Sequence, residues 1–293
     1  MTEPSAPQPH YWIDSHCHPA FALREPGAWM DLLARSRRAG VREIIAIGTG
    51  PDDWDLYRNL AREHPAGVHW TLGLHPSEVG PDGEDSVDRL ESLLAASPDP
   101  APRAIGEIGL DVFRVAKPDR EEVLTRQRQA FRRQLDLARQ AGLPVVIHSR
   151  ETLEACLEVL AEADFPAERA LFHCFADGPE AMEQLRALGA RASFTGLVTF
   201  ANARRVQEAL QVLGLEELIL ETDSPYLSPE PHRGRTNEPA RIPVIGECCA
   251  RLLDCPVATV ADRATANTRA FFGLPIPPGG DLPGASGEPG EPA

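Results

Sequence analysis

Short runs with β-strand character alternate with longer amphipathic stretches along most of this chain, and that alternation restricts its possible folds. Strands separated by helical crossovers pair in parallel, which leaves either a closed barrel or an open, doubly wound sheet. No Gly-x-Gly-x-x-Gly sequence follows the first strand, so an α/β fold with a TIM-type (β/α)8 barrel is favoured. The expected strands are Tyr11–His16, Glu43–Gly48, Val68–Leu74, Arg103–Glu107, Pro144–His148, Ala170–His173, Ala192–Thr195 and Leu218–Glu221.

Helical apolar spacing fills the intervals between these strands. The clearest example is Arg120–Ala141, in which Leu124, Phe131 and Leu135 belong to one apolar stripe. Two further helices are expected after the last strand, over Pro243–Leu253 and Val257–Phe272. The other expected helices are Trp29–Ala39, Trp54–His64, Val87–Ala95, Thr152–Ala163, Pro179–Leu188 and Ala203–Leu213.

The 293 residues are enough for one large domain, which we assign to residues 11–274. Residues 1–10 are polar and rich in proline, and residues 275–293 are mainly Pro, Gly, Ser and Glu, so both ends are expected to be disordered. The chain has no apolar run of about 18 residues and no signal-peptide pattern. Its six cysteines have no framework spacing. They predict reduced thiols in a cytoplasmic protein without a membrane partner.

Six side chains that can bind metals stand at or just after the carboxyl ends of expected strands. In a barrel these ends form the rim that carries the active site. A lone histidine at a strand end usually makes only a polar contact, but burying six titratable groups together without metals would be costly. We therefore predict a metal site made of His16, His18, Glu107, His148, His173 and Asp223.

The number of these residues predicts two divalent ions. A catalytic zinc keeps three protein ligands and an open position, whereas six ligands suit a pair of ions about 3.5–4 Å apart. A pair of this kind needs a bridging anion, and the only lysine, Lys117, lies in a loop and cannot serve as a carboxylated bridge. Glu107 is therefore the expected bridge. The ligand types are compatible with Zn²⁺, Mn²⁺ or Mg²⁺.

The order and spacing of several motifs resemble those of the TatD family of metal-dependent hydrolases. The resemblance extends from about Ile13 to Phe272. The motifs are Asp14-Ser15-His16-Cys17-His18, Gly73-Leu74-His75-Pro76, Gly106-Glu107-Ile108-Gly109-Leu110-Asp111, Ile147-His148-Ser149-Arg150, His173-Cys174-Phe175, Glu221-Thr222-Asp223-Ser224-Pro225-Tyr226-Leu227 and Arg233-Gly234-Arg235-Thr236-Asn237-Glu238-Pro239.

The resemblance implies a barrel of the metal-dependent hydrolase superfamily with deoxyribonuclease activity. One metal would be held by His16, His18, Glu107 and Asp223, and the other by Glu107, His148 and His173. Two departures from the family pattern lie near the mouth of the barrel. The run Val112-Phe113-Arg114 replaces two tyrosines and an arginine, and Ala176-Asp177 replace Ser-Gly.

Four residues near the expected site are candidates for contacts with the substrate. His75 could contact a phosphate or donate a proton, although a histidine in a loop can also simply bond to backbone. Arg150 could hold a phosphate oxygen, or could pair with Glu151 or Glu154. Arg233 and Arg235 lie in the loop after the last strand, where charged residues are often only solvated.

We predict a metal-assisted hydrolysis in which Asp223 takes the proton from the attacking water and Glu107 and His75 assist. The net charge of −15 excludes binding of nucleic acid by the overall field. A few rim arginines can still hold a free end, so we expect a 3′–5′ exodeoxyribonuclease acting on single-stranded DNA. Two alternatives stay open: an ester or amide hydrolase, such as a D-aminoacyl-tRNA deacylase, and a non-catalytic barrel scaffold. The oligomeric state is open, with a slight preference for a monomer.

Overall fold

The computed structural model describes residues 10–80 and 83–275. The disorder expected for residues 1–10 and 275–293 therefore falls almost wholly outside the described residues. Within those residues, His10 and Pro275 are exposed at the two ends.

Parallel strands form the centre of the molecule. They are β1 (Trp12–Cys17), β2 (Val41–Ala46), β3 (Val68–Trp70), β4 (Ile105–Asp111), β5 (Val145–Arg150), β6 (Ala170–Phe172), β7 (Arg191–Phe194) and β8 (Ile219–Leu220). One sheet has the order β1-β2-β3 and the other the order β4-β5-β6-β7-β8. Isolated parallel bridges between Leu72 and Ile105, and between Cys17 and Ser224, connect the two sheets on both sides. These bridges complete the ring of the predicted TIM-type barrel.

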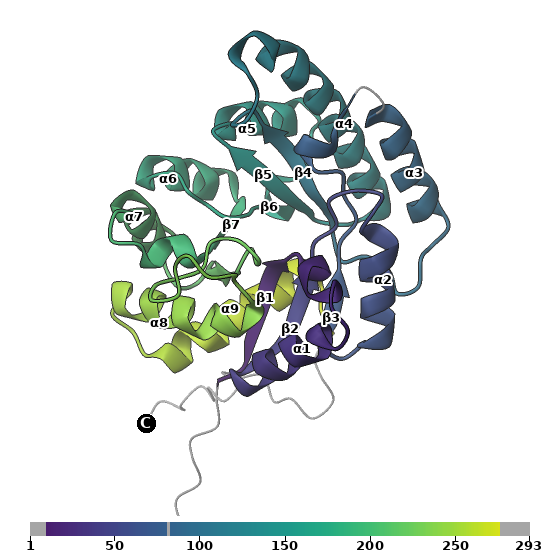
Figure 1. Cartoon of the computed structure of the whole chain (residues 1–293). Coiled ribbons are helices and arrows are strands. Elements are labelled where there is room, and N and C mark those ends of the chain that lie inside the picture. The colour runs from purple at the N-terminus through teal and green to yellow at the C-terminus, as the bar shows by residue number, and fades with distance from the viewer. Residues whose placement is uncertain (1–9, 81–82, 276–293) are drawn as a thin grey trace, which may run out of the picture.

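The helices lie outside the strands, as Figure 1 shows. Their bounds are α1 (Ala28–Arg38), α2 (Trp54–Glu63), α3 (Gly83–Ala95), α4 (Arg120–Ala141), α5 (Leu153–Glu162), α6 (Pro179–Leu188), α7 (Arg204–Leu213), α8 (Ile242–Leu252) and α9 (Val257–Phe272). No helix within the described ranges combines the length and the apolar character needed to span a bilayer.

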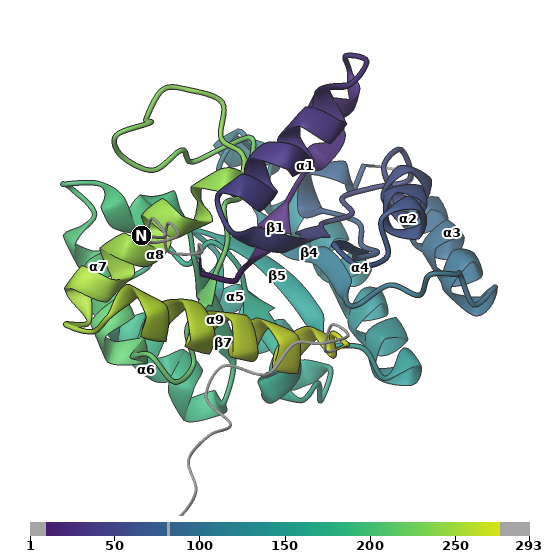
Figure 2. The same ribbon diagram turned by 90° about the horizontal axis from the view of Figure 1, so that it is seen from below.

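The core has two parts, because successive side chains of each strand point to opposite faces. The larger part lies between the strands and the surrounding helices. The smaller part fills the barrel and includes Ile45, Val146, Leu171 and Ile219 from four different strands. Phe272 of α9 joins this inner cluster, and α9, which crosses the molecule in Figure 2, contacts β1 and β8.

A buried polar network lies at the amino-terminal end of β2. The Glu43 carboxylate accepts a hydrogen bond from Tyr11 and lies 2.8 Å from His69 Nε2. The guanidinium of Arg269 on α9 contacts Glu43 and donates to the Tyr11 hydroxyl at 2.9 Å. Burial would raise the pKa of Glu43, but His69, Tyr11 and Arg269 together outweigh it, so the pKa lies below its ordinary value. The network ties α9 to the barrel wall.

Replacing Arg269 by alanine should lower the free energy of unfolding by about 3–5 kcal/mol, because Glu43 would stay buried without its cationic partner. The matched control is Arg263→Ala, which removes an exposed pair with Glu216 and should cost about 1 kcal/mol or less. Urea unfolding at neutral pH measures both. Because the pKa of Glu43 is lowered on folding, its contribution is present above the ordinary glutamate pKa and disappears as the pH falls through the folded value. Equal losses in the two variants would contradict the prediction.

Every expected strand differs from the structure at one or both ends, and β5 continues past His148 to Arg150, so His148 does not end it as predicted. The largest differences are at the ends of β3 and β4. β3 ends at Trp70 instead of Leu74, and the chain then passes through a single bridge residue, Leu72. β4 continues to Asp111, so the prediction that Glu107 ends the fourth strand was wrong. Hydrogen bonds to β5 extend the strand past this residue, since Gly109 and Asp111 pair with His148 and Arg150.

Candidate metal centre

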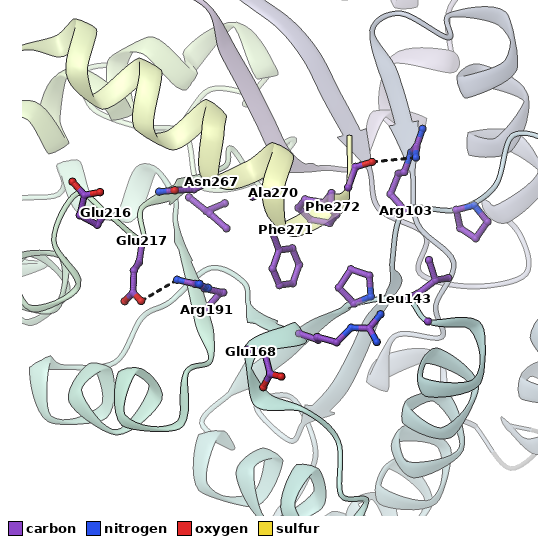
Figure 3. A pocket seen from close by; sticks show the side chains of 16 residues that line it. Arg103, Leu143, Glu168, Arg191, Glu216, Glu217, Asn267, Ala270, Phe271 and Phe272 are labelled. Atoms are coloured by element: carbon purple, nitrogen blue, oxygen red, sulfur yellow. Dashed lines mark hydrogen bonds and ion pairs between the residues drawn. The ribbon is translucent and has the colours of Figure 1, made fainter. Parts of the chain in front are cut away.

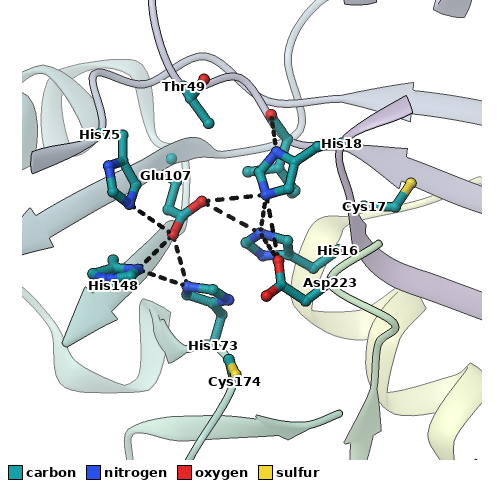
Figure 4. Close-up of polar contacts among 12 residues, drawn as sticks. His16, Cys17, His18, Thr49, His75, Glu107, His148, His173, Cys174 and Asp223 are labelled. Atoms are coloured by element: carbon teal, nitrogen blue, oxygen red, sulfur yellow. Dashed lines mark hydrogen bonds and ion pairs between the residues drawn. The ribbon is translucent and has the colours of Figure 1, made fainter. Parts of the chain in front are cut away.

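The six predicted metal-binding residues come together at the carboxyl-terminal rim of the barrel. The Glu107 carboxylate lies at their centre (Figure 4). Its Oε2 atom is 3.4 Å from His16 Nε2 and 3.6 Å from His18 Nε2. Asp223 completes this side, with Oδ1 3.4 Å from His18 Nε2. These four side chains come from β1, the residue that follows it, β4 and the loop after β8.

The second oxygen of Glu107 faces a different set of rings. Oε1 lies 2.7 Å from His148 Nδ1 and 2.7 Å from His173 Nε2, and it lies 3.4 Å from His75 Nε2. Figure 4 shows His148 and His18 on opposite sides of the carboxylate. One carboxylate thus contacts two separate groups of ligand-type side chains, which is the arrangement expected of a bridging residue.

We call the side chains around Glu107 Oε2 (His16, His18 and Asp223) the Oε2 group, and those around Glu107 Oε1 (His148, His173 and His75) the Oε1 group. The distances in the Oε2 group suit a metal ion. Two nitrogen or oxygen ligands about 2.1 Å from one tetrahedral ion are about 3.4 Å apart. His16 Nε2, His18 Nε2 and Asp223 Oδ1 lie 3.2–3.8 Å from one another, and Glu107 Oε2 lies 3.4 and 3.6 Å from the two histidine nitrogens. The Oε1 group is tighter, with two contacts of hydrogen-bond length. An ion there requires those contacts to lengthen.

The outer ring nitrogens of His18 and His148 face hydrogen-bond acceptors. His18 Nδ1 is 3.2 Å from the Ile47 carbonyl oxygen, and His148 Nε2 is 3.0 Å from Asp111 Oδ2. The neutral His18 ring therefore carries its proton on Nδ1, and the lone pair of its inner nitrogen points to the centre. His148 has a carboxylate oxygen at each nitrogen, so a metal ion at Nδ1 would select the tautomer with the proton on Nε2, facing Asp111. Metal-binding histidines are held in this way by carboxylates and carbonyls.

Glu221 lies behind the other two histidines and is fully buried. Its carboxylate accepts hydrogen bonds from the Cys174 amide at 2.7 Å and the Ser193 hydroxyl at 2.7 Å. The same carboxylate is 3.9 Å from His16 Nδ1 and 3.4 Å from His173 Nδ1. Asp111 therefore supports the His148 ring, whereas Glu221 lies beside the His16 and His173 rings without a hydrogen bond to either Nδ1 atom.

His75 is oriented in the opposite sense. Its Nδ1 accepts a hydrogen bond from the Ser77 amide at 3.0 Å, and an amide nitrogen can only donate. The neutral ring must then carry its proton on Nε2, the atom that faces Glu107. An Nε2–H group cannot bind a metal but can donate to an oxygen. This geometry separates His75 from the four other histidines.

The charges of the cluster perturb the acidity of its members. Burial would raise the pKa of Glu107, but the charges of His173 and His75 and contact with His148 outweigh it and hold the pKa well below its ordinary value. Burial would lower the pKa of His173, but Glu107 and Glu221 raise it well above its ordinary value. Metal ions bind only neutral imidazoles, so loading the site must release protons and must weaken in acid.

Irregular strand pairing turns the ligands toward the barrel axis. β1 has a register shift between Asp14 and Cys17, and β4 has one between Ile105 and Ile108. Each shift lies beside a ligand, and such bulges re-aim side chains next to active sites. Alternation along the strand places His16 and His18 on one face. Strict alternation would, however, put His16 on the face opposite to Ile13, which points into the barrel. The irregular pairing therefore explains how both Ile13 and His16 face the barrel axis.

Asp14 is a site residue that sequence reasoning missed. Its carboxylate accepts hydrogen bonds from the amide of Thr222 at 2.9 Å and from its hydroxyl at 2.5 Å, so it joins β1 to the segment before Asp223. Complete burial raises its pKa to about 7. The spacing of Asp14, His16 and His18 was a usable signal, because alternation gives all three the same local parity.

The predicted substrate-contact arginines lie around this cluster and not in it. Arg150 stacks on the Phe113 ring at 3.5 Å instead of pairing with Glu151 or Glu154. Arg233 lies 4.3 Å from the Phe200 ring centre, and Arg235 is exposed. Cys17 and Cys174 bond to Ile45 and Thr195 and point away from the cluster (Figure 4). None of the six cysteines, all of which are described, is in a disulfide.

A separate pocket of about 540 Å³ lies at the amino-terminal ends of the strands (Figure 3). It is lined by residues that precede β4 to β8 and by the end of α9, and Arg191 pairs there with Glu217 at 2.9 Å. None of the clustered histidines or carboxylates lines it. We therefore place the chemistry at the opposite rim, because that end of a barrel carries the catalytic loops.

Comparisons with known proteins agree with this geometry. A family model described as TatD related DNase matches residues 13–273. A Mycobacterium tuberculosis H37Rv protein named "Uncharacterized metal-dependent hydrolase TatD" is 32% identical over 265 residues, covering 89% of this chain and 98% of that protein. An Erwinia amylovora protein named "3'-5' ssDNA/RNA exonuclease TatD" is 32% identical over 250 residues, covering 83% and 93%.

Solved structures give the same result for the fold. The crystal structure of YjjV, a TatD homolog from Escherichia coli K12, matches with a TM-score of 0.80 and 28% identity, covering 90% of this chain and 98% of that one. A TatD-family hydrolase from Entamoeba histolytica matches with a TM-score of 0.77 at 20% identity, covering 90% and 99%. At that identity the second match supports the fold alone.

Proposed function

This chain belongs to the TatD-related DNase family, and we propose that it is a two-metal phosphodiesterase that removes nucleotides from the 3′ end of single-stranded DNA. Family membership makes it a metal-dependent hydrolase. The finer activity is supported by the name of the Erwinia amylovora relative, a 3'-5' ssDNA/RNA exonuclease.

The orientation of the histidine rings is the observation that carries the proposal. His16, His18, His148 and His173 direct one nitrogen toward Glu107. The other nitrogen faces a hydrogen-bond acceptor in His18 and His148, and it lies near the Glu221 carboxylate without a hydrogen bond in His16 and His173. The two oxygens of Glu107 face separate groups. We assign His16, His18, Glu107 and Asp223 to one ion, and Glu107, His148 and His173 to the other, with Zn²⁺, Mn²⁺ and Mg²⁺ as candidates.

Two divalent ions, when bound, make water more acidic and neutralise charge on a phosphate group. We assign to the Asp223 carboxylate the role of accepting the proton of the attacking water, because it is the carboxylate of the cluster that is not placed between the two groups of histidines, and its side chain is 14% exposed. We assign to His75 Nε2–H a hydrogen bond to a phosphate oxygen or to the leaving group, since its tautomer leaves a donor facing the centre.

The exposed cations near the rim suit a small nucleic-acid contact. Arg150, Arg233 and Arg235 are exposed, whereas the protein as a whole carries a net charge of −15. Electrostatic attraction of long DNA is therefore unfavourable, and contact with a few phosphates is what the rim can supply. A free single-stranded end is the substrate that needs the smallest contact.

The test is turnover by the metal-loaded protein on four substrates: single-stranded DNA, duplex DNA, an acyl ester and an aminoacyl-tRNA, each with Mg²⁺, Mn²⁺ and Zn²⁺. We expect stepwise shortening of single-stranded DNA from its 3′ end, with weak dependence on salt because few phosphates are neutralised. Labels at the 5′ and 3′ ends distinguish the polarity. Efficient ester cleavage without DNA cleavage under any metal would replace this proposal with a deacylase.

A further inference from the structure

Two of the exposed large hydrophobic side chains in the described part of the chain are aromatic, and both belong to the rim. Phe113 is 44% exposed and Tyr226 is 63% exposed. Phe113 follows β4 by two residues, and Tyr226 lies three residues after Asp223. The other exposed large hydrophobics are Met30 and Leu188, which belong to α1 and α6 and are aliphatic.

Phe113 is linked by hydrogen bonds to the Oε1 side of the metal centre. Its amide donates to Asp111 Oδ1 at 2.7 Å, and the other oxygen of Asp111 is 3.0 Å from His148 Nε2. The Arg150 guanidinium lies 3.5 Å from the ring centre and covers one face. The ring is thus held beside a cation that can contact a phosphate, and it is still nearly half exposed.

Tyr226 has a comparable position on the Oε2 side. Its amide donates to the Asp223 carbonyl at 2.9 Å, and its own carbonyl accepts from Asn237 Nδ2 at 2.7 Å. The ring centre is 6.5 Å from that of His18. The backbone is therefore fixed from two sides, and the aromatic ring projects into solvent next to a candidate ligand.

An exposed aromatic ring on a fixed backbone has a specific use in an acidic protein. Stacking of a nucleobase on such a ring stabilises a complex without neutralising phosphates, and each stacked base can be worth a factor of about ten or more in affinity. His148 and His18 lie on opposite sides of Glu107, so the two rings flank the centre. We propose that Phe113 and Tyr226 are base-stacking subsites that hold nucleotides on the two sides of the scissile phosphodiester. This inference rests on the proposed nuclease function and names its substrate contacts.

The experiment compares an oligo-dT strand with a strand of equal length whose sugars carry no bases. Phe113→Ala and Tyr226→Ala should each raise KM for oligo-dT about ten-fold and leave KM for the base-free strand within two-fold. Tyr226→Phe, which keeps the ring, should restore the wild-type KM. The matched control is Leu188→Ala, which removes an equally exposed apolar side chain at the end of α6.

Equilibrium binding supplies a second readout that does not depend on turnover. Anisotropy of fluorescein-labelled oligo-dT, measured on variants that also carry Asp223→Asn, should show the same ten-fold losses, and the losses should persist at high salt. Cleavage of oligo-dT with unchanged KM and affinity in both alanine variants would overturn the stacking subsites and leave the nuclease function intact. Absence of both binding and cleavage of oligo-dT by the wild-type protein would overturn both proposals.

Discussion

Replacing Glu107 by alanine is expected to reduce metal content at both positions of the centre and to lower kcat by about a thousand-fold or more. The physical reason is that Oε1 and Oε2 face different groups, so one side chain serves two ions. Metal analysis of the purified protein after dialysis, followed by titration with Zn²⁺ or Mn²⁺, measures the effect. The predicted losses of bound metal and of kcat are larger for Glu107→Ala than for the removal of any single histidine.

The matched variant is His148→Ala, which removes a group only from the Oε1 side and should mainly empty one position. Glu107→Gln keeps the size of the side chain and removes its charge, so it separates bridging from packing. Circular dichroism should show that all three variants keep the fold. Two ions bound tightly by Glu107→Ala protein would disprove the assignment of the bridge.

Replacing Asp223 by asparagine is expected to lower kcat by about 10²–10⁴-fold while leaving much of the substrate affinity in place. The amide keeps an oxygen that can face His16 and His18, but it cannot accept a proton from water. Burial would raise the pKa of the native carboxyl, but the contact with His18 and the charge of His16 outweigh it, so the pKa lies below its ordinary value and the group is ionised at neutral pH.

Single-turnover rates and oligo-dT affinity, measured together with metal content, distinguish loss of the base from loss of an ion. We expect a large fall in the chemical rate with metal content close to that of the wild-type protein. A kcat within ten-fold of wild type at full metal occupancy would exclude Asp223 as the proton acceptor. His75→Ala provides a comparison, because it removes the donor on the Oε1 side and leaves Asp223 untouched.

Much of the fold could be predicted from local sequence patterns. The expected bounds of α4, α6 and α9 agree with the structure to the residue, because each helix has a long apolar stripe and a clear end, such as Gly142 and Gly189 in left-handed conformation. Short buried strands were less well defined. β3 and β8 have only a few residues each, and their apolar runs give no internal signal for where pairing stops.

The sequence alone determined which side chains could form the centre, because ligand-type residues at successive strand ends must meet on one rim of a parallel barrel. The tertiary structure decided what each of them can do. Whether a histidine offers a lone pair or a proton depends on the neighbour of its outer nitrogen. Ile47 and Asp111, which face His18 and His148, come from other elements of the chain, whereas the Ser77 amide that fixes His75 is only two residues away. The bulges in β1 and β4 likewise depend on pairing with neighbouring strands. Composition and spacing are local properties, whereas the surroundings of His18 and His148 and the direction of the ligand side chains are set by contacts that exist only after the barrel closes.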